Sequence, residues 1–236
     1  MGADLQGALS RLVRVTLDAV LPPRCLGCGA RDRWLCADCA DRLPPLPAAH
    51  CRVCAASLPG VAVCPACYRR RPSFDKVAAP YLHHGLARDL VHALKYRGHR
   101  HVAPILAGAM AGVAPPDVDV VIAVPLHRGR RRERGFNQSE LLARAAAGRL
   151  GLPLRLDALR RERPTRPQVE LAHDERAANV LGAFVTPARL EGTRVLLVDD
   201  VCTTGATLDA CAAALKRAGA SEVDCLVATR ASTTRP

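Results

Sequence analysis

The chain has 236 residues, of which 49% are hydrophobic and 3% aromatic, and it carries a formal net charge of +12 at pH 7. This length is enough for one ordinary hydrophobic core and a small appendage that needs another source of stability. The excess of lysine and arginine favours polyanionic partners such as phosphates, nucleotides or nucleic acid, whereas the scarcity of aromatic rings argues against a base-stacking platform.

Residues 1–21 place Leu5, Leu9 and Leu12 at helical spacing, which predicts an N-terminal amphipathic helix. Charged residues interrupt its apolar run, so the segment is neither a signal peptide nor a membrane span. No later segment has an uninterrupted apolar run long enough for a transmembrane helix. We therefore expect a cytoplasmic protein with no membrane span.

Eleven cysteines need an explanation in a reducing compartment. A C-x-x-C turn places two thiolates on one side of the chain, and two such turns facing each other make the tetrahedral four-sulfur cage that Zn²⁺ prefers. Four pairs are enough for two structural zinc ions. The pairs are Cys25 and Cys28, Cys36 and Cys39, Cys51 and Cys54, and Cys64 and Cys67.

The segment 22–72 that holds these pairs is rich in turn residues and poor in large apolar ones, which predicts a small double zinc ribbon folded by its metal, with a core separate from the rest. Disulfides or a thioredoxin-like redox pair are the alternatives, but four regular repeats exceed what a redox motif needs. We favour consecutive over alternating pairing, with His50 as a less favoured substitute ligand. The remaining cysteines look like buried residues of a second domain: Cys202, Cys211 and Cys225.

Residues 73–236 form the predicted second domain, and its first clear strand is the apolar run Val120 to Val124. The run ends in Pro125, Leu126 and His127. A basic loop follows, and then a helix with Leu141, Leu142, Ala145 and Ala146. The loop holds five arginines in seven residues: Arg128, Arg130, Arg131, Arg132 and Arg134. Such a charge run is either a site for a bound anion or a solvated stretch that contacts nucleic-acid backbone.

Residues 160–184 are polar and prolyl at first and then helix-forming. This composition predicts a mobile lid between the two strand regions.

The apolar run Val195 to Val198 predicts a central parallel strand with Asp199 and Asp200 at its carboxyl end. A polar loop follows, and then a helix with one apolar face: Leu208, Cys211, Ala212 and Leu215. In open α/β sheets ligands bind at such junctions, because the helix N-terminus presents free backbone N–H groups to an anion.

The loop after the acidic pair contains Thr203, Thr204, Gly205 and Thr207. Small hydroxyl residues and a glycine let backbone wrap a phosphate, while two carboxylates accept hydrogen bonds from vicinal hydroxyls. A phosphate beside a diol describes a ribose 5-phosphate. The alternatives are a Walker B element or a response-regulator acidic cluster, but no G-x-x-x-x-G-K-S/T loop occurs in the chain to complete a nucleotide-hydrolase site.

Val195 to Thr207 resembles the phosphoribosyl pyrophosphate loop of type I phosphoribosyltransferases, D-D-x-x-T-T-G-x-T. The resemblance implies an open, mainly parallel α/β sheet of that fold, preceded by the double zinc ribbon. It also implies that Asp199 and Asp200 hold the ribose 2′ and 3′ hydroxyls. The implied 5-phosphate cradle is Thr203, Thr204, Gly205, Ala206 and Thr207. The implied pyrophosphate loop is Pro125, Leu126, His127 and Arg128.

With the cysteine pairs, the remaining motifs resemble the ComF family of amidophosphoribosyltransferase-like proteins over nearly the whole chain. These motifs are LKYRG at Leu94 to Gly98, VPLHRGRRRERGFNQ at Val124 to Gln138, T-x-x-Q at Thr165 to Gln168, ERAANV at Glu175 to Val180, and VDDVCTTGATL at Val198 to Leu208. The family commonly has an aliphatic residue at the position of Cys202.

The resemblance implies binding of phosphoribosyl pyrophosphate with Mg²⁺, transfer of its pentosyl group to an acceptor that no motif identifies, and a link to natural competence. Single- or double-stranded DNA and competence proteins are the expected partners. The alternative is a non-catalytic, zinc-ribbon nucleic-acid-binding accessory protein in DNA uptake or processing. No general base stands out, since His127, Lys95 and Tyr96 are more often structural at such positions.

Overall fold

The computed structural model describes residues 23–58, 60, 62–162 and 182–232. The predicted helix over 1–21 and most of the predicted lid lie outside these residues, as do the T-x-x-Q and ERAANV motifs. Contacts between residues divide the chain into two compact units, Met1–Leu43 and Pro44–Pro236. The domain boundaries expected from the sequence, at 22 and 73, stay a prediction. Within the described part, no helix has the length and apolarity needed to cross a membrane.

The first unit, where described, is a short ribbon around four cysteines. Its chain reverses between Arg24 and Arg31, which form an isolated antiparallel bridge, and Cys25 N–H donates to the Ala30 carbonyl at 2.7 Å. The helix α2 (Ala37–Asp41) follows.

The second unit is built on a five-stranded sheet in which every described pairing is parallel. The strand order is β1-β7-β6-β3, and β2 also pairs with β7. The strands are β1 (Lys76–Ala78), β2 (Tyr81–Leu82), β3 (Val120–Ala123), β6 (Arg194–Cys202) and β7 (Glu222–Arg230). A separate antiparallel pair joins β4 (Arg160–Arg161) to β5 (Phe184–Val185). The predicted parallel α/β fold is confirmed.

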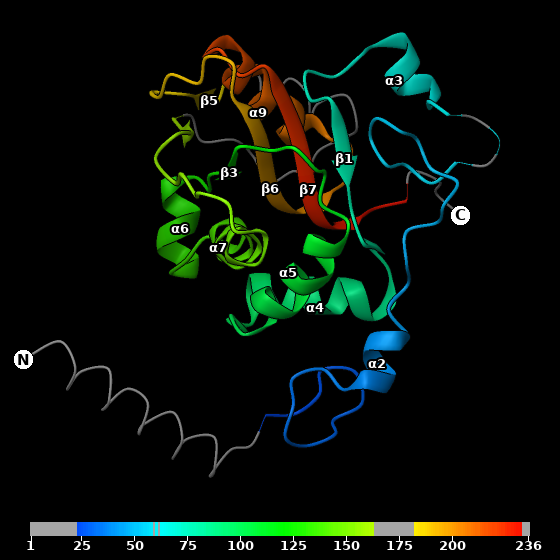
Figure 1. The fold of residues 1–236 in the computed structure, drawn as a ribbon. Coiled ribbons are helices and arrows are strands. Elements are labelled where there is room, and N and C mark those ends of the chain that lie inside the picture. Colours follow the sequence, from blue (N-terminus) through cyan, green and yellow to red (C-terminus); the bar gives the residue numbers. More distant parts are fainter. Residues whose placement is uncertain (1–22, 59, 61, 163–181, 233–236) are drawn as a thin grey trace, which may run out of the picture. The chain divides into compact units, whose positions relative to one another are not determined.

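Helices cover both faces of this sheet (Figure 1). Helix α7 packs on β3 and β6, whereas α4 and α5 contact β7. Helix α9 packs on β6 and β7 from the other side and also contacts β5. The helices of this unit are α3 (Pro65–Arg69), α4 (Gly85–Tyr96), α5 (Val102–Gly112), α6 (Arg128–Arg134), α7 (Gln138–Leu150) and α9 (Ala206–Arg217).

The core lies between the central strands and α9, as the apolar pattern predicts. Alternate residues of a strand face one side, so Val195 and Leu197 of β6 join the same buried cluster as Leu208 and Leu215 of α9. The three unpaired cysteines are fully or almost fully buried, as expected of small core residues: Cys202, Cys211 and Cys225.

Strand β6 is longer than its apolar run. It continues through Asp199 and Asp200 to Cys202, because β7 pairs with it as far as Cys202 opposite Arg230. The acidic pair therefore belongs to the strand itself and is held by its ladder.

The second cysteine cluster shares the core of the sheet, so the expectation of a wholly separate ribbon core is wrong for this half. Val53, Ala55 and Ala56 are buried in one cluster with Phe74 and the sheet residues. Backbone pairing adds to this contact, because Val77 N–H donates to the Val53 carbonyl at 2.8 Å. The physical reason is that a segment with so few apolar residues gains burial by packing on the neighbouring sheet edge.

Leu197 tests the importance of the central strand. Its side chain is completely buried, so Leu197→Ala should lower the free energy of unfolding by about 2–5 kcal/mol through lost burial and a residual cavity. The exposed Val113 is the control, and Val113→Ala should change stability by less than about 0.5 kcal/mol. Urea denaturation measures both. Equal effects would contradict the assignment of Leu197 to the core.

Candidate functional site

A cavity of about 310 Å³ opens at the carboxyl ends of β3 and β6. It is the place where parallel sheets bind ligands, because loops and helix N-termini converge there. Its lining combines the acidic pair of β6 with residues of α4, α6 and the start of α7. The polar members are His83, His92, Lys95, Tyr96, Arg130, Arg134, Asn137, Gln138, Ser139, Arg161, Asp199, Asp200, Thr203 and Thr207.

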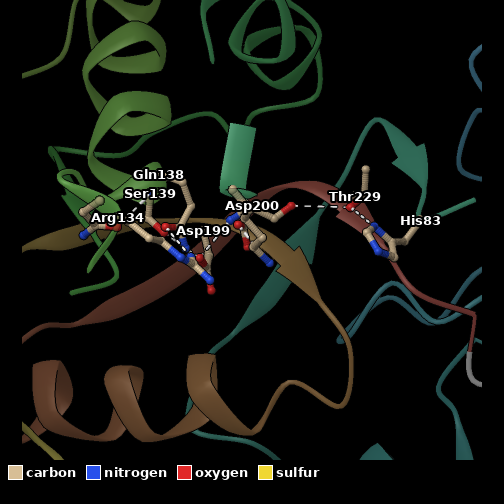
Figure 2. A network of polar contacts seen from close by, with 9 residues as sticks. His83, Arg134, Gln138, Ser139, Asp199, Asp200 and Thr229 are labelled. Atoms are coloured by element: carbon tan, nitrogen blue, oxygen red, sulfur yellow. Dashed lines mark hydrogen bonds and ion pairs between the residues drawn. The ribbon is translucent and has the colours of Figure 1, made fainter. Parts of the chain in front are cut away.

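Asp199 is fixed by two hydrogen bonds (Figure 2). Its Oδ1 atom accepts from the Ser139 hydroxyl at 2.7 Å and from the backbone N–H of Asp200 at 2.9 Å. Ser139 is itself held in the first turn of α7, where its backbone N–H donates to Asn137 Oδ1 at 3.0 Å. The Asn137 amide in turn donates to the Val124 carbonyl at 3.0 Å. This chain of contacts ties the end of β3 to the carboxylate on β6.

Asp200 pairs with a lysine from the neighbouring helix. Lys95 of α4 places Nζ 3.0 Å from Asp200 Oδ2, and both side chains are largely buried. Burial alone would lower the pKa of Lys95, but Asp200 and Asp199 outweigh it and raise the pKa above its usual value. Lys95 therefore remains a cation that neutralises part of the acidic pair.

Asp199 has a strongly perturbed pKa. Burial and the adjacent charge of Asp200 raise its pKa to about 7, against the opposing influence of the Ser139 hydroxyl and Lys95. A carboxyl in this condition exchanges its proton near neutral pH. Hydroxyl groups or a cation arriving at the cavity would favour its ionised form.

His83 enters the site without a signal in the sequence. Its Nδ1 atom lies 2.9 Å from Thr229 Oγ1 on β7 (Figure 2). Burial, together with the positive charge of Lys95, lowers the pKa of His83 to about 4. The imidazole is therefore neutral at pH 7 and is a weak base.

The predicted phosphate cradle forms a turn between β6 and α9. Gly205 is the N-cap of α9 with φ of 84°, a left-handed conformation that favours glycine. The Ala206 N–H donates to Thr204 Oγ1 at 3.3 Å. Thr203 and Thr207 line the cavity of the acidic pair. In contrast, Thr204, Gly205 and Ala206 border a different cavity of about 670 Å³ beside the second cysteine cluster.

The basic segment is a short helix and not the loop that its composition suggested. His127 caps α6 by accepting from the Gly129 N–H at 3.2 Å, which is a structural role. Four residues apart, Arg130 and Arg134 share the face that lines the cavity. The other three arginines are exposed: Arg128, Arg131 and Arg132.

Of the predicted pyrophosphate loop, Pro125 and Leu126 line the cavity. The other two residues, His127 and Arg128, line a neighbouring cavity of about 460 Å³ that Pro125 and Leu126 also border.

The two cysteine clusters have the geometry of four-sulfur metal sites. Within each cluster all four Sγ atoms lie within 4.8 Å of one another. Three Sγ pairs are 3.6–3.7 Å apart, close to the roughly 3.8 Å edge of a tetrahedron with Zn–S bonds of about 2.3 Å. The consecutive pairing is the one found, with Cys25, Cys28, Cys36 and Cys39 in one cluster and Cys51, Cys54, Cys64 and Cys67 in the other.

The pKa values within the second cluster differ, because burial raises the pKa of Cys54 and Cys67 whereas Cys51 is held as a thiolate. Burial raises the pKa of the Cys51 thiol, but backbone N–H groups of Cys54 and Cys64 outweigh it and hold the pKa at about 6. The Cys64 N–H lies 3.2 Å from Cys51 Sγ. His50 does not join a cluster, since its Nδ1 atom is 2.7 Å from the Pro47 carbonyl. The donor set therefore suits structural Zn²⁺.

Comparison with protein families finds two matches. Residues 16–68 match the double zinc ribbon domain, and residues 137–236 match the phosphoribosyl transferase domain. The two matches correspond to the cysteine clusters and to the half of the sheet that carries the acidic pair.

Curated relatives cover most of the chain. The DNA utilization protein YhgH of Salmonella typhi is 32% identical over 197 residues, which are 80% of this chain and 81% of that protein. Competence protein F of Haemophilus influenzae is 28% identical over 85% of this chain and 93% of that protein. Competence protein ComFC of Bacillus subtilis is 26% identical over 80% of each.

Two solved structures are similar over part of their length. The allosteric regulatory enzyme of purine biosynthesis is 26% identical with a TM-score of 0.38, and the match covers 53% of this chain and 25% of that longer one. A purine phosphoribosyltransferase from Pyrococcus horikoshii is 19% identical with a TM-score of 0.30, over 64% of this chain and 77% of that one.

The raised pKa of Asp199 predicts how stability depends on pH. An aspartate in the unfolded chain has a pKa of about 4. Between pH 4 and about 7 the folded state therefore binds one more proton at Asp199 than the unfolded state does. The stability that this proton contributes is fully present below pH 4 and is lost as the pH rises through 7. The wild-type protein should therefore lose stability relative to Asp199→Asn across this interval.

Urea denaturation at several pH values measures this difference. Ser139→Ala removes a hydrogen bond that favours the ionised carboxyl of Asp199, so the pKa should rise further and the loss of stability should extend to higher pH. As a control, Ser221→Ala removes an exposed hydroxyl that donates to the Gly192 carbonyl, and the pH dependence of its stability should follow the wild type. Parallel curves for wild type and Asp199→Asn would refute the raised pKa.

Proposed function

Since the chain belongs to the ComF family, with a double zinc ribbon and a phosphoribosyltransferase-like domain, we propose that it binds phosphoribosyl pyrophosphate with Mg²⁺ and transfers the phosphoribosyl group to an acceptor. One observation carries this proposal. The acidic pair, Thr203 and Thr207 line one cavity with two arginines of α6, Arg130 and Arg134, at the ends of β6 and β3. The groups that would bind a diol and a phosphate therefore share one cavity with cationic side chains.

The acidic pair is the proposed ribose clamp. Ionised Asp199 and Asp200 accept hydrogen bonds from the vicinal hydroxyls, and Ser139 and Lys95 hold the two carboxylates in place. The turn from Thr203 to Thr207 then receives the 5-phosphate at the N-terminus of α9, where backbone N–H groups and the helix dipole favour an anion.

Arg130, Arg134 and Lys95 are the proposed neutralising groups for the pyrophosphate end. The lone pair of the nucleophile forms a bond to the anomeric carbon, while the bond from that carbon to the pyrophosphate oxygen breaks and the pyrophosphate leaves with the electron pair. Neutral His83 lines the same cavity, but a histidine with a pKa of about 4 is a weak base, so we assign the proton of the nucleophile to solvent water. Positioning and charge neutralisation supply most of the catalysis.

The metals have separate proposed roles. Mg²⁺ supplies charge neutralisation to the departing pyrophosphate, and the carboxylate oxygens of Asp199 and Asp200 are donors of the hard type that it prefers. Zn²⁺ is structural and completes the two cysteine clusters.

A second function is favoured by the exposed arginines of α6 and by the names of the relatives, which are DNA utilization and competence proteins. In this alternative the chain is a nucleic-acid-binding accessory. Arg132 is exposed, while Arg130 and Arg134 line the cavity. The helix therefore offers one face to a small anion and another to a phosphate backbone.

The cysteine clusters predict two zinc ions per chain. Elemental analysis of the purified protein should find a ratio close to two, and Cys36→Ser should reduce it to one because it breaks only the first cluster. Cys211→Ser is the control, since Cys211 lies outside both clusters, and should retain two ions. Protein without zinc but with mapped disulfides would overturn this role.

The acidic pair predicts a strong effect of charge on ligand affinity. Replacing both Asp199 and Asp200 with Asn preserves shape but removes charge-assisted acceptors that contribute about 1.5–3 kcal/mol each. Affinity for phosphoribosyl pyrophosphate with Mg²⁺ should therefore fall at least tenfold in calorimetric titration, with folding retained. Undiminished binding by the folded double variant would reject the ribose clamp.

Arg132→Gln is the matched control and separates the two functions. It should leave the affinity for phosphoribosyl pyrophosphate unchanged. If α6 contacts a phosphate backbone, the substitution should lower the number of counterions released on binding of single-stranded DNA by about one. A protein that binds DNA but no phosphoribosyl pyrophosphate would favour the accessory function.

A further inference from the structure

Arg230 is a buried cation with an unusual set of partners. It ends β7 and is only 1% exposed. Its Nε donates to the Cys54 carbonyl at 2.7 Å, and its Nη1, which carries two hydrogens, is shared among three further carbonyls: Cys202 at 3.0 Å, Thr203 at 2.6 Å and Ala231 at 2.6 Å. The planar fork of arginine is suited to such a set, because its donors point in fixed and divergent directions. A buried charge is tolerated only with partners of this kind.

These partners join two parts of the chain that are far apart in sequence. Cys54 belongs to the second cysteine cluster, and its Sγ atom also lies 3.9 Å from the guanidinium. Thr203 begins the proposed phosphate cradle. One side chain thus contacts both a metal-site residue and the ligand loop, and both contacts lie within the same compact unit.

The contacts to the loop set the direction of its N–H groups. In a planar trans peptide the carbonyl and the following N–H point to opposite sides. Because the Thr203 carbonyl points to Arg230, the Thr204 N–H points away from it. The same relation holds for the Cys202 carbonyl and the Thr203 N–H. The Cys202 carbonyl also accepts from the Ala231 N–H at 2.9 Å. Arg230 therefore orients the Thr204 N–H and, together with that backbone bond, the Thr203 N–H, which are two of the donors proposed for the 5-phosphate.

The contact between Arg230 and Cys54 depends on the geometry of the second cysteine cluster. Cys54 Sγ lies 3.7 Å from Cys64 Sγ, which is close to the separation expected of two ligands of one zinc ion. Two further contacts support the loop from the segment that follows the cluster. The Ser73 N–H donates to Asp209 of α9 at 2.6 Å, and a Cβ at Gly205 would lie 3.5 Å from the Phe74 ring.

We propose that Arg230 is a positioning residue that couples metal occupancy of the second cysteine cluster to ligand affinity at the phosphate loop; this rests on the proposed function. With the metal bound, the Cys54 carbonyl and the loop carbonyls hold the guanidinium together, and the loop is ready for a phosphate. Loss of the metal frees the Cys54 end and loosens the loop. Coupling is reciprocal, so the ligand must also retain the metal.

Zinc release tests this reciprocity. In Cys36→Ser protein the second cluster holds the single remaining zinc ion, and transfer of that ion to a chromophoric chelator is followed with and without phosphoribosyl pyrophosphate and Mg²⁺. We expect the ligand to slow release at least threefold. Arg230→Lys in the same background retains the charge but loses the fork, and should abolish the slowing. Arg194→Lys, at the start of β6 and paired with Asp119 at the surface, should retain it.

Ligand affinity provides the second measurement. Cys51→Ser, which breaks the second cluster, should lower the affinity for phosphoribosyl pyrophosphate at least tenfold more than Cys36→Ser does. If the zinc-loaded wild-type protein does not bind the ligand, the proposed function itself fails. If it binds but zinc release is equally fast with and without ligand, the coupling is overturned. This last comparison decides the matter even where Arg230→Lys does not fold.

Discussion

The parallel pairing of β6 with β7 is the constraint on which the site depends. The ladder continues to Cys202 opposite Arg230, well beyond the apolar residues that would form a strand by themselves. It keeps Asp199 and Asp200 in extended backbone and buried, within reach of α4 and α7. The same register places Arg230 beside the loop that follows Cys202. A shift of one residue would turn these side chains to the opposite face.

Local and periodic features could be predicted from the sequence. The apolar runs of β3 and β6, the buried face of α9 and the C-x-x-C turns depend on neighbouring residues alone, and the structure contains them. The end of β6 could not be predicted, because it is set by pairing with a strand that comes 20 residues later. Ser139, Lys95 and His83 were not identified as site residues for the same reason, since tertiary packing brings them to the cavity.

The role of the second cysteine cluster illustrates how a weak local core is supplemented. Its own apolar residues are few, but Val53, Ala55 and Ala56 are buried with residues of the sheet. Composition correctly indicated that this segment needs an additional source of stability, and metal ligation is one such source. The sheet edge is another, which composition does not reveal because it depends on where β1 lies.

Helix α6 has a consequence for the way this surface can change in evolution. Its arginines are divided between two faces, with Arg130 and Arg134 at the cavity of the acidic pair and Arg132 at the surface. Substitution on one face leaves the other intact, because side chains two positions apart on a helix point in different directions. A short, highly charged helix can therefore gain or lose an affinity for large polyanions without altering the small-molecule cavity behind it.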